Sequence, residues 1–274
     1  MQKPKPAPSE EVRPAQRAAR RLQEAHERRE RFAPLSAELA PRSADEAYAI
    51  QDCFVALRAS RRGAIAGYKI ALSSAEMRRF VGVEHPQAGV MLASTLHRTP
   101  ARVRAADYVH LIVEFEIALQ MAADLPSADA PYTRERVAPF VGAVMPAIEL
   151  ADDRDADYGQ LASHPLELIA DNGWNEGAVL GVPLAGWRSL DLAALHGVAR
   201  INGDVVGEGV GAAAMGHPLE ALAWIANHLA ARGRSLVYRD VVITGSMITT
   251  KVATAGDLVQ FKVAGLGDVE LRVD

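Results

Sequence analysis

VHLIVEFEIALQM, residues 109–121, is the stretch that decides the fold. It is apolar and rich in β-branched residues, which predicts a buried strand. Two carboxylates interrupt it, Glu114 and Glu116. Because side chains alternate between the two faces of a strand, both glutamates share one face, about 7 Å apart at the backbone. The apolar residues around them then point the other way, into a core.

Two like charges on one face of an apolar strand repel each other and lose hydration, so something should offset that cost. A hard divalent cation, Mg²⁺ or Mn²⁺, is the simplest candidate because it prefers carboxylate oxygens. A second apolar stretch, VGAVMPAIEL at residues 141–150, predicts another strand and supplies a third acid, Glu149. Three acids on two strands are enough for a Mg²⁺ site. The alternative at this stage is a solvated strand face that carries glutamates.

The composition of the 274 residues is that of an ordinary globular protein. A net charge of −4 gives no electrostatic reason to expect a nucleic-acid partner. No run of about 18 apolar residues occurs, so neither a transmembrane helix nor a membrane partner is expected. The single cysteine, Cys53, excludes an intrachain disulfide, is expected to pack in a helix, and suits a reducing cytoplasm.

Residues 1–42 are predicted to form a basic N-terminal extension, with 10 Lys and Arg against 6 Asp and Glu. Residues 1–8 are rich in Pro and Lys and are expected to be disordered. The segment Ser9–Phe32 predicts a charged helix with Pro14 near its first turn, where proline is tolerated. The extension is therefore expected to be partly helical.

Residues 43–274 are predicted to form the main domain. Its first helix begins at Ser43, which has the spacing of a capping box with Glu46. Strand-like segments then dominate, and helices are inserted among them without a regular strand–helix alternation. This order favours an α+β fold over a parallel α/β sheet.

Further functional candidates lie on both sides of the glutamate strand. Lys69 interrupts a strand-like run, IAGYKIAL at 65–72, where a lysine is either an edge-strand gatekeeper or a functional ammonium. The turn-rich segment VGVEHPQAGVML, residues 81–92, is expected to cross the surface and to be available to line a pocket. The glycines at 207–211 allow close backbone approach, but their spacing is not that of a Walker or Rossmann loop.

Seven short motifs occur in one consistent order along the chain. They are GYKIALSS (67–74), EFE (114–116), PAIEL (146–150), IADN (169–172), GEGVGAAAMGHPLEALAWIANHLAARG (207–233), ITGSM (243–247) and GD…GLGDV (256–269). Together they resemble the 2-hydroxypentadienoate hydratase and 4-oxalocrotonate decarboxylase branch of the fumarylacetoacetate hydrolase superfamily. Each motif alone is weak, but the ordered set is specific and covers residues 43–274.

The resemblance implies a mixed β-sheet roll of the fumarylacetoacetate hydrolase C-terminal type, with flanking helices and an N-terminal helical segment. It also implies a hydratase that acts on a 2-hydroxy-2,4-dienoate or 2-oxo-4-enoate acid through an enolate stabilised by Mg²⁺ or Mn²⁺. We expect a cytoplasmic homo-oligomer in aromatic catabolism. By position, the resemblance assigns the metal to Glu114, Glu116 and Glu149, the pocket lysine to Lys69, and substrate contacts to Leu72, Ser73 and Ser246.

Three alternatives to the hydratase remain open. The same metal ligands serve a 4-oxalocrotonate-type decarboxylase, whose reaction uses the same enolate. An acylpyruvate hydrolase needs an activated water, for which His85 is the available base. A non-catalytic paralogue would retain the fold and use the basic helix at 9–32 as its contact surface.

One segment departs from the family pattern. Where the family usually has Pro-Asp-aromatic-Gly, this chain has Pro86–Gln87–Ala88–Gly89. An amide cannot act as a general base, so catalysis is expected to depend on Lys69, a water on the metal, or His85. If Gln87 lines the pocket, Gln87→Asp should raise turnover, and Ala88 in place of an aromatic residue would enlarge the pocket. The alternative is that Gln87 faces solvent in a surface turn.

Overall fold

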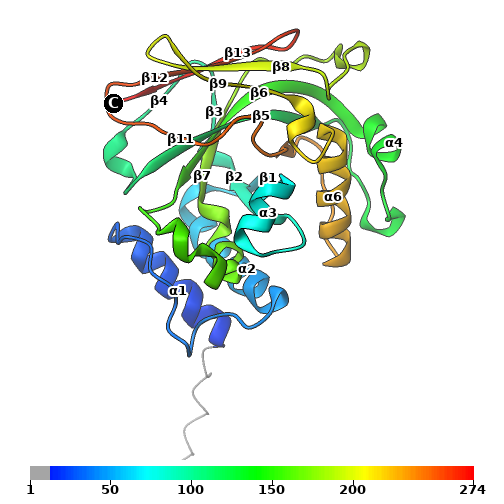
Figure 1. The fold of residues 1–274 in the computed structure, drawn as a ribbon. Helices are drawn as coiled ribbons and strands as arrows, with labels where there is room; N and C mark the ends of the chain where they lie inside the picture. The colour runs from blue at the N-terminus through cyan, green and yellow to red at the C-terminus, as the bar shows by residue number, and fades with distance from the viewer. Residues whose placement is uncertain (1–12) are drawn as a thin grey trace, which may run out of the picture.

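The N-terminal helices form a pair at one end of the molecule (Figure 1). The computed structural model describes residues 13–274, so the predicted disordered leader at 1–8 lies outside the described residues. Helix α1, Pro14–Glu27, has its proline in the first turn as predicted, although it ends before the expected Phe32. Helix α2, Ala44–Arg62, is capped by Ser43, whose Oγ accepts a hydrogen bond from the Glu46 amide. Helix α1 packs directly on α2, which lies on the other side of the proposed domain boundary after residue 42. That boundary stays a prediction.

The large sheet has eight strands and carries the glutamates on its central strands. Its order is β2-β1-β10-β5-β6-β7-β3, with β11 paired to β5, and two of its pairs, β1–β10 and β3–β7, are parallel. The strands are β1 (Ile65–Ala71), β2 (Gln87–Leu92), β3 (Leu96–Arg98), β5 (Leu111–Met121), β6 (Val141–Asp152), β7 (Asn175–Leu180), β10 (Val241–Ile243) and β11 (Lys251–Val252).

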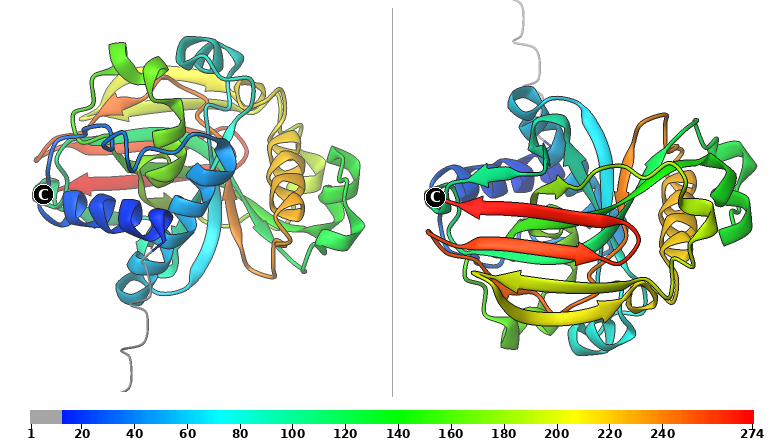
Figure 2. Two further views of the ribbon diagram at one scale, coloured as in Figure 1. Left: turned by 90° about the horizontal axis from the view of Figure 1, so that it is seen from below. Right: turned by 90° about the horizontal axis from the view of Figure 1, so that it is seen from above.

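The small sheet covers one face of the large sheet (Figure 2). It has five strands in the order β4-β13-β12-β8-β9, and its parts are β4 (Ala101–Val103), β8 (His196–Ile201), β9 (Asp204–Val210), β12 (Leu258–Val263) and β13 (Gly267–Val273). Phe115 of β5 meets Phe261 of β12 with ring centroids 5.4 Å apart. The apolar face of the glutamate strand is therefore in the core, as its alternation predicts.

The remaining helices flank the sheets. They are α3 (Ala75–Val81), α4 (Arg134–Val137), α5 (Pro165–Ala170) and α6 (Pro218–Ala231), with short 3₁₀ turns between other elements. Helix α6 packs on α4 and β1, and α2 packs on α5 and β2. Two mixed sheets with flanking helices confirm the predicted α+β fold. None of the described helices is long and apolar enough to cross a membrane.

The segment at 81–92 differs from its expected surface course. Residues Gln87–Leu92 form strand β2, which pairs with β1, and every residue of β2 is buried. Alternation places Gln87 and Gly89 on the face that carries Lys69, and Ala88 and Val90 in the core. The turn signals at Gly82 and Pro86 precede the strand, and the apolar run after them decides its burial.

Candidate metal centre and active site

Three carboxylates meet on the face of the large sheet opposite the main core. Glu114 of β5 lies directly across from Glu149 of β6, and Glu116 follows two residues along β5. One carboxylate oxygen from each residue lies within 4.8 Å of the others. Glu116 and Glu149 are fully buried and Glu114 is partly exposed. The predicted shared face of the two β5 glutamates is confirmed, and the solvated-face alternative is wrong for this cluster.

Neighbouring donors orient all three carboxylates, and two of the three keep a free oxygen. Glu116 Oε1 and Glu149 Oε2 are buried and have no hydrogen-bond partner among the described residues. Buried oxygens of this kind are costly unless a cation or another donor meets them. The orienting donors are the Gly245 amide to Glu116 Oε2 (2.6 Å), Asn175 Nδ2 to Glu149 Oε1 (2.9 Å) and Thr250 Oγ1 to Glu114 Oε1 (2.9 Å).

The electrostatics of the cluster are those of a site with excess negative charge. Burial raises the pKa of Glu116 well above its usual value, and the carboxylates of Glu149 and Glu114 raise it further. Burial also raises the pKa of Glu149, against the opposing effect of Lys69. Three carboxylates and one ammonium leave a formal charge of −2, which a divalent cation would neutralise.

Lys69 projects from β1 into this cluster. Its Nζ lies 3.1 Å from Glu149 Oε1, and the side chain is buried. Burial alone lowers the pKa of Lys69, but the surrounding carboxylates, Glu149 first, outweigh burial and raise it. Because β1 lies between β2 and β10, the edge-strand interpretation of this lysine is wrong.

Two glycines make room for the lysine side chain. A Cβ at Gly89 would lie 2.7 Å from Lys69 Cγ, and one at Gly173 would lie 3.3 Å from Lys69 Nζ. The first distance is shorter than any van der Waals contact, so any side chain at Gly89 would displace the lysine. The glycines therefore fix the path of the lysine toward Glu149.

A left-handed turn at residues 172–174 supports the site from the side of β7. Asn172, Gly173 and Trp174 have φ of 55°, 58° and 59°, which is strained for the two non-glycine residues. The Asn172 side chain holds the turn to β2, since Oδ1 accepts from the Val90 amide and Nδ2 donates to the Val90 carbonyl. The Asp171–Asn172–Gly173 sequence is typical of a turn, but it gives no sign that the turn places Asn175 against the metal cluster.

Buried charges tie helix α1 to this turn. Asp171 is fully buried and contacts His26 Nε2 at 2.6 Å and the Arg154 guanidinium. Burial lowers the pKa of His26, but Asp171 and Glu176 outweigh that effect and raise it. The basic N-terminal helix is thus part of the packing behind the active site.

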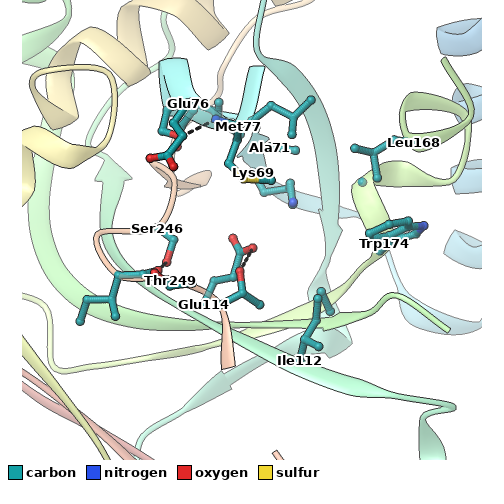
Figure 3. A pocket seen from close by; sticks show the side chains of 18 of the residues that line it. Lys69, Ala71, Glu76, Met77, Ile112, Glu114, Leu168, Trp174, Ser246 and Thr249 are labelled. Atoms are coloured by element: carbon teal, nitrogen blue, oxygen red, sulfur yellow. Dashed lines mark hydrogen bonds between the residues drawn. The ribbon is translucent and has the colours of Figure 1, made fainter. Parts of the chain in front are cut away.

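Glu114 and Lys69 line a cavity of about 370 Å³, whereas Glu116 and Glu149 are buried next to them and do not line it. Figure 3 shows Leu168 and Trp174 on one side, Glu76 and Met77 on another, and Lys69 with Glu114 directed between them. The residues predicted for substrate contact, Leu72, Ser73 and Ser246, all line this cavity.

The local geometry of those three residues differs. Leu72 has φ of 55°, and the carbonyls of Leu72 and Ser73 accept hydrogen bonds from Arg78 Nη1. Ser246 Oγ accepts from the Phe115 amide at 3.1 Å and donates to the Ile248 carbonyl at 2.6 Å. The hydroxyl of Ser246 therefore shapes its own loop, and the substrate-contact roles of all three residues stay predictions.

The glycine-rich strand β9 supports the loop that contains Ser246. A Cβ at Gly209 would lie 2.0 Å from the Met247 carbonyl oxygen, and one at Gly207 would lie 2.3 Å from Ile248 Cγ2. The predicted close backbone approach is confirmed. It brings the 246–250 loop against the glutamates of β5.

Gln87 and His85 do not line the cavity. Gln87 is 3% exposed, and its Nε2 donates to the Pro165 carbonyl at 3.0 Å, so the surface-turn alternative is wrong. Ala88 packs in the core and leaves the cavity unchanged, contrary to the expected enlargement. His85 is exposed before β2, because the chain turns there before entering the sheet. The structure therefore brings Lys69 to the carboxylates but not His85.

Comparison with known proteins agrees with this geometry. The family model for the fumarylacetoacetate (FAA) hydrolase C-terminal region matches residues 68–274. The chain belongs to the fumarylacetoacetate hydrolase family. Members similar to it include a 2-keto-4-pentenoate hydratase from Paraburkholderia phymatum, 32% identical over 92% of this chain and 94% of that protein. A 2-hydroxyhexa-2,4-dienoate hydratase from Comamonas testosteroni is 31% identical with the same coverage.

A solved family member has the same architecture throughout. The 4-oxalocrotonate decarboxylase of Pseudomonas putida G7 superposes with a TM-score of 0.86 at 26% identity, covering 95% of this chain and 97% of that one. Its structures are complexed with calcium and acetate or with magnesium and adipate. In the present chain, the two unpaired buried carboxylate oxygens and the oxygen-only ligand set fit a hard divalent cation.

Proposed function

We propose that this protein is a Mg²⁺- or Mn²⁺-dependent hydratase that acts on a 2-hydroxy-2,4-dienoate or 2-oxo-4-enoate acid. The observation that carries the proposal is the buried carboxylate cluster with one buried lysine beside it, at the base of a cavity of small-molecule size. The names of two relatives at 31–32% identity, both hydratases of such acids, support the choice of reaction.

Glu114, Glu116 and Glu149 would hold the ion. When bound, a divalent cation supplies Lewis-acid stabilisation of the negative charge that develops on the 2-oxygen of the substrate. The Gly245 amide and the Asn175 side chain fix the orientation of two of these carboxylates before the ion arrives. Such outer hydrogen bonds keep the ligands in place and limit reorganisation.

Lys69 is the residue proposed to bind the substrate carboxylate. Its ammonium is fixed beside Glu149 and faces the cavity. It can donate a hydrogen bond to the carboxylate of the substrate, and its raised pKa favours this role of the protonated form over release of a proton. Hydration moves the 2-hydroxyl proton to C5, adds the water oxygen to C4 and adds a proton to C3.

Decarboxylation of a 4-oxalocrotonate-type acid is the second candidate function. It is favoured by the likeness in fold to the Pseudomonas putida decarboxylase over nearly the whole chain. The carboxylate cluster serves either reaction, since both develop charge on the same 2-oxygen. The acylpyruvate hydrolase alternative loses its proposed base, because His85 is exposed and outside the cavity.

A side-by-side assay separates these reactions. The protein with Mg²⁺ is offered 2-hydroxypenta-2,4-dienoate, 4-oxalocrotonate and an acylpyruvate. Hydration is expected to remove the dienol absorbance without release of CO₂. Release of CO₂ from 4-oxalocrotonate as the faster reaction would overturn the hydratase proposal in favour of the decarboxylase.

A binding experiment separates an enzyme from a non-catalytic paralogue. Glu116→Gln should abolish Mg²⁺ or Mn²⁺ binding in calorimetry, whereas Glu84→Gln, an exposed residue outside the cavity, should not change it. If the wild-type protein binds neither ion, with or without pyruvate or oxalate, the enzyme proposal fails. The basic helix α1 would then be tested as a partner surface.

Cellular location and assembly complete the proposal. We propose a cytoplasmic homo-oligomer, with the single cysteine, half-buried in α2 as predicted, in keeping with a reducing compartment. Light scattering on the purified protein tests the assembly. A mass near the 29.4 kDa of one chain would contradict it.

A further inference from the structure

The cavity wall away from the carboxylates is apolar. Ile112 lies two residues from Glu114 on β5, and Ala151 lies two residues from Glu149 on β6, so both are on the face of the sheet that carries the glutamates. They belong to a hydrophobic cluster that reaches the cavity surface, made with Leu161, Leu168 and Trp174 and with Leu72 packed against it. We call these six residues the apolar wall. A ligand that extends from the metal cluster meets this wall.

The apolar wall is held in place by aromatic packing. Trp174 is 5% exposed and makes edge contacts with Phe32 and Tyr158, at centroid distances of 5.6 and 5.9 Å. The Tyr158 hydroxyl donates a hydrogen bond to Asp153 Oδ2 at 2.9 Å. The indole Nε1 of Trp174 is buried and has no hydrogen-bond partner among the described residues, so the rings of the wall offer one neutral donor and no cation.

The charges around the cavity are unevenly placed. Within the described range 13–274, Lys69 is the one cationic side chain that lines it, and it lies beside Glu149 at the metal end. Away from that end the charged lining residue is an acid, Glu76, exposed on α3 at the mouth. A second carboxylate on the substrate would meet apolar groups, neutral hydroxyls and a negative charge, and none of the described lining residues away from the metal end is cationic.

We propose that the distal half of the substrate, beyond C4, is uncharged and apolar, and that the apolar wall and Glu76 exclude dicarboxylic acids. The inference rests on the proposed function, since it takes the 2-oxo acid end to lie at the carboxylate cluster. An unmatched charge in a water-poor site costs far more than a missing apolar contact. The monocarboxylate is expected to be preferred about 100-fold over a dicarboxylate of equal length.

Binding of inert analogues tests the inference without turnover. The Mg²⁺-loaded protein is titrated in a calorimeter with 2-oxohexanoate and with 2-oxoadipate, which has the same number of carbons and a second carboxylate. Tighter binding of 2-oxohexanoate by about 100-fold supports the proposal. Equal affinity, or tighter binding of 2-oxoadipate, overturns it.

A charge placed at the mouth provides a second test. Met77 is 38% exposed, so Met77→Arg should fold. Because Met77 lines the cavity, the new guanidinium should tighten the binding of 2-oxoadipate about 10-fold relative to that of 2-oxohexanoate. Phe80→Arg is the matched control, because Phe80 is on the same helix, is 52% exposed and does not line the cavity. An equal effect of the two variants would mean that the lining does not set the preference.

The outcomes separate this inference from the proposed function. Turnover of 2-hydroxypenta-2,4-dienoate together with equal binding of the two analogues retains the hydratase and rejects the apolar distal half. A binding preference for 2-oxohexanoate without any dienoate turnover retains the apolar distal half and rejects the hydratase. Turnover that extends to a dienoate with a distal alkyl group supports both.

Discussion

The buried contact between Asp171 and Arg154 makes a sharp prediction about how the N-terminal helix supports the site. Asp171→Asn removes the negative charge that faces both His26 and Arg154. His26 can release its proton when the carboxylate is lost, but a guanidinium cannot. The variant therefore leaves a buried cation without its anionic partner, and only neutral acceptors remain, namely the new side-chain amide oxygen and the Glu30 carbonyl 3.4 Å away.

The magnitude follows from burial. The side chains of Asp171 and Arg154 are 0% and 2% exposed, so solvent screens neither charge. Removing one partner of such a pair costs about 3–5 kcal/mol of the free energy of unfolding. For a chain of this size that corresponds to a fall of about 6–20 °C in Tm.

Calorimetric and denaturant unfolding of the two proteins measure the loss. Asp52→Asn is the control, because Asp52 likewise pairs with two basic side chains, Arg232 and Arg234, but its own side chain is 30% exposed. The control should lose about 1 kcal/mol or less. A loss of that small size for Asp171→Asn would refute the reasoning, and so would an equal loss in both variants.

Three further predictions test parts of the site. A raised folded-state pKa of His26 contributes stability that is complete below its ordinary value of 6.5 and disappears as the pH rises through the folded-state pKa. His26→Gln should therefore be destabilised most below pH 6.5, and a pH-independent difference in unfolding free energy from the wild type contradicts this. Asn175→Ala should weaken Mg²⁺ binding about 10–100-fold in calorimetry, because Glu149 loses its orienting bond, and unchanged affinity contradicts that. Gly89→Ala should lower turnover of the dienoate about 100-fold, because the new Cβ would displace Lys69. In the control Gly186→Ala the new Cβ meets nothing within 4 Å, so turnover should not change. Equal rates for the two variants contradict the prediction.

Local rules of the chain determined several elements correctly. The two-residue period of 109–121 placed Glu114 and Glu116 on one face and the apolar residues in the core. The Asn202–Gly203 pair is a sequence signal for a two-residue hairpin turn, and that turn forms between β8 and β9 with both residues at positive φ. Such features depend on residues that are neighbours in sequence, so the sequence suffices to predict them.

The burial of β2 shows where local rules fail. Its turn-rich sequence predicted a surface segment, yet pairing with β1 takes Gln87 into the interior and Ala88 into the core. The basic N-terminal helix gave no local sign that His26 would meet Asp171, 145 residues away. Burial in both cases is decided by partners distant in the chain.

The sequence by itself determined which residue types are available for the chemistry, the face that β5 presents, and the family. Only the tertiary structure decided that Glu149 lies across from Glu114, that Lys69 reaches Glu149, and that an apolar wall begins beside them. The reason is physical. Strand register and the packing of distant segments are set by the exposed apolar area and the unpaired polar groups of the whole chain. A short stretch of sequence does not contain that information.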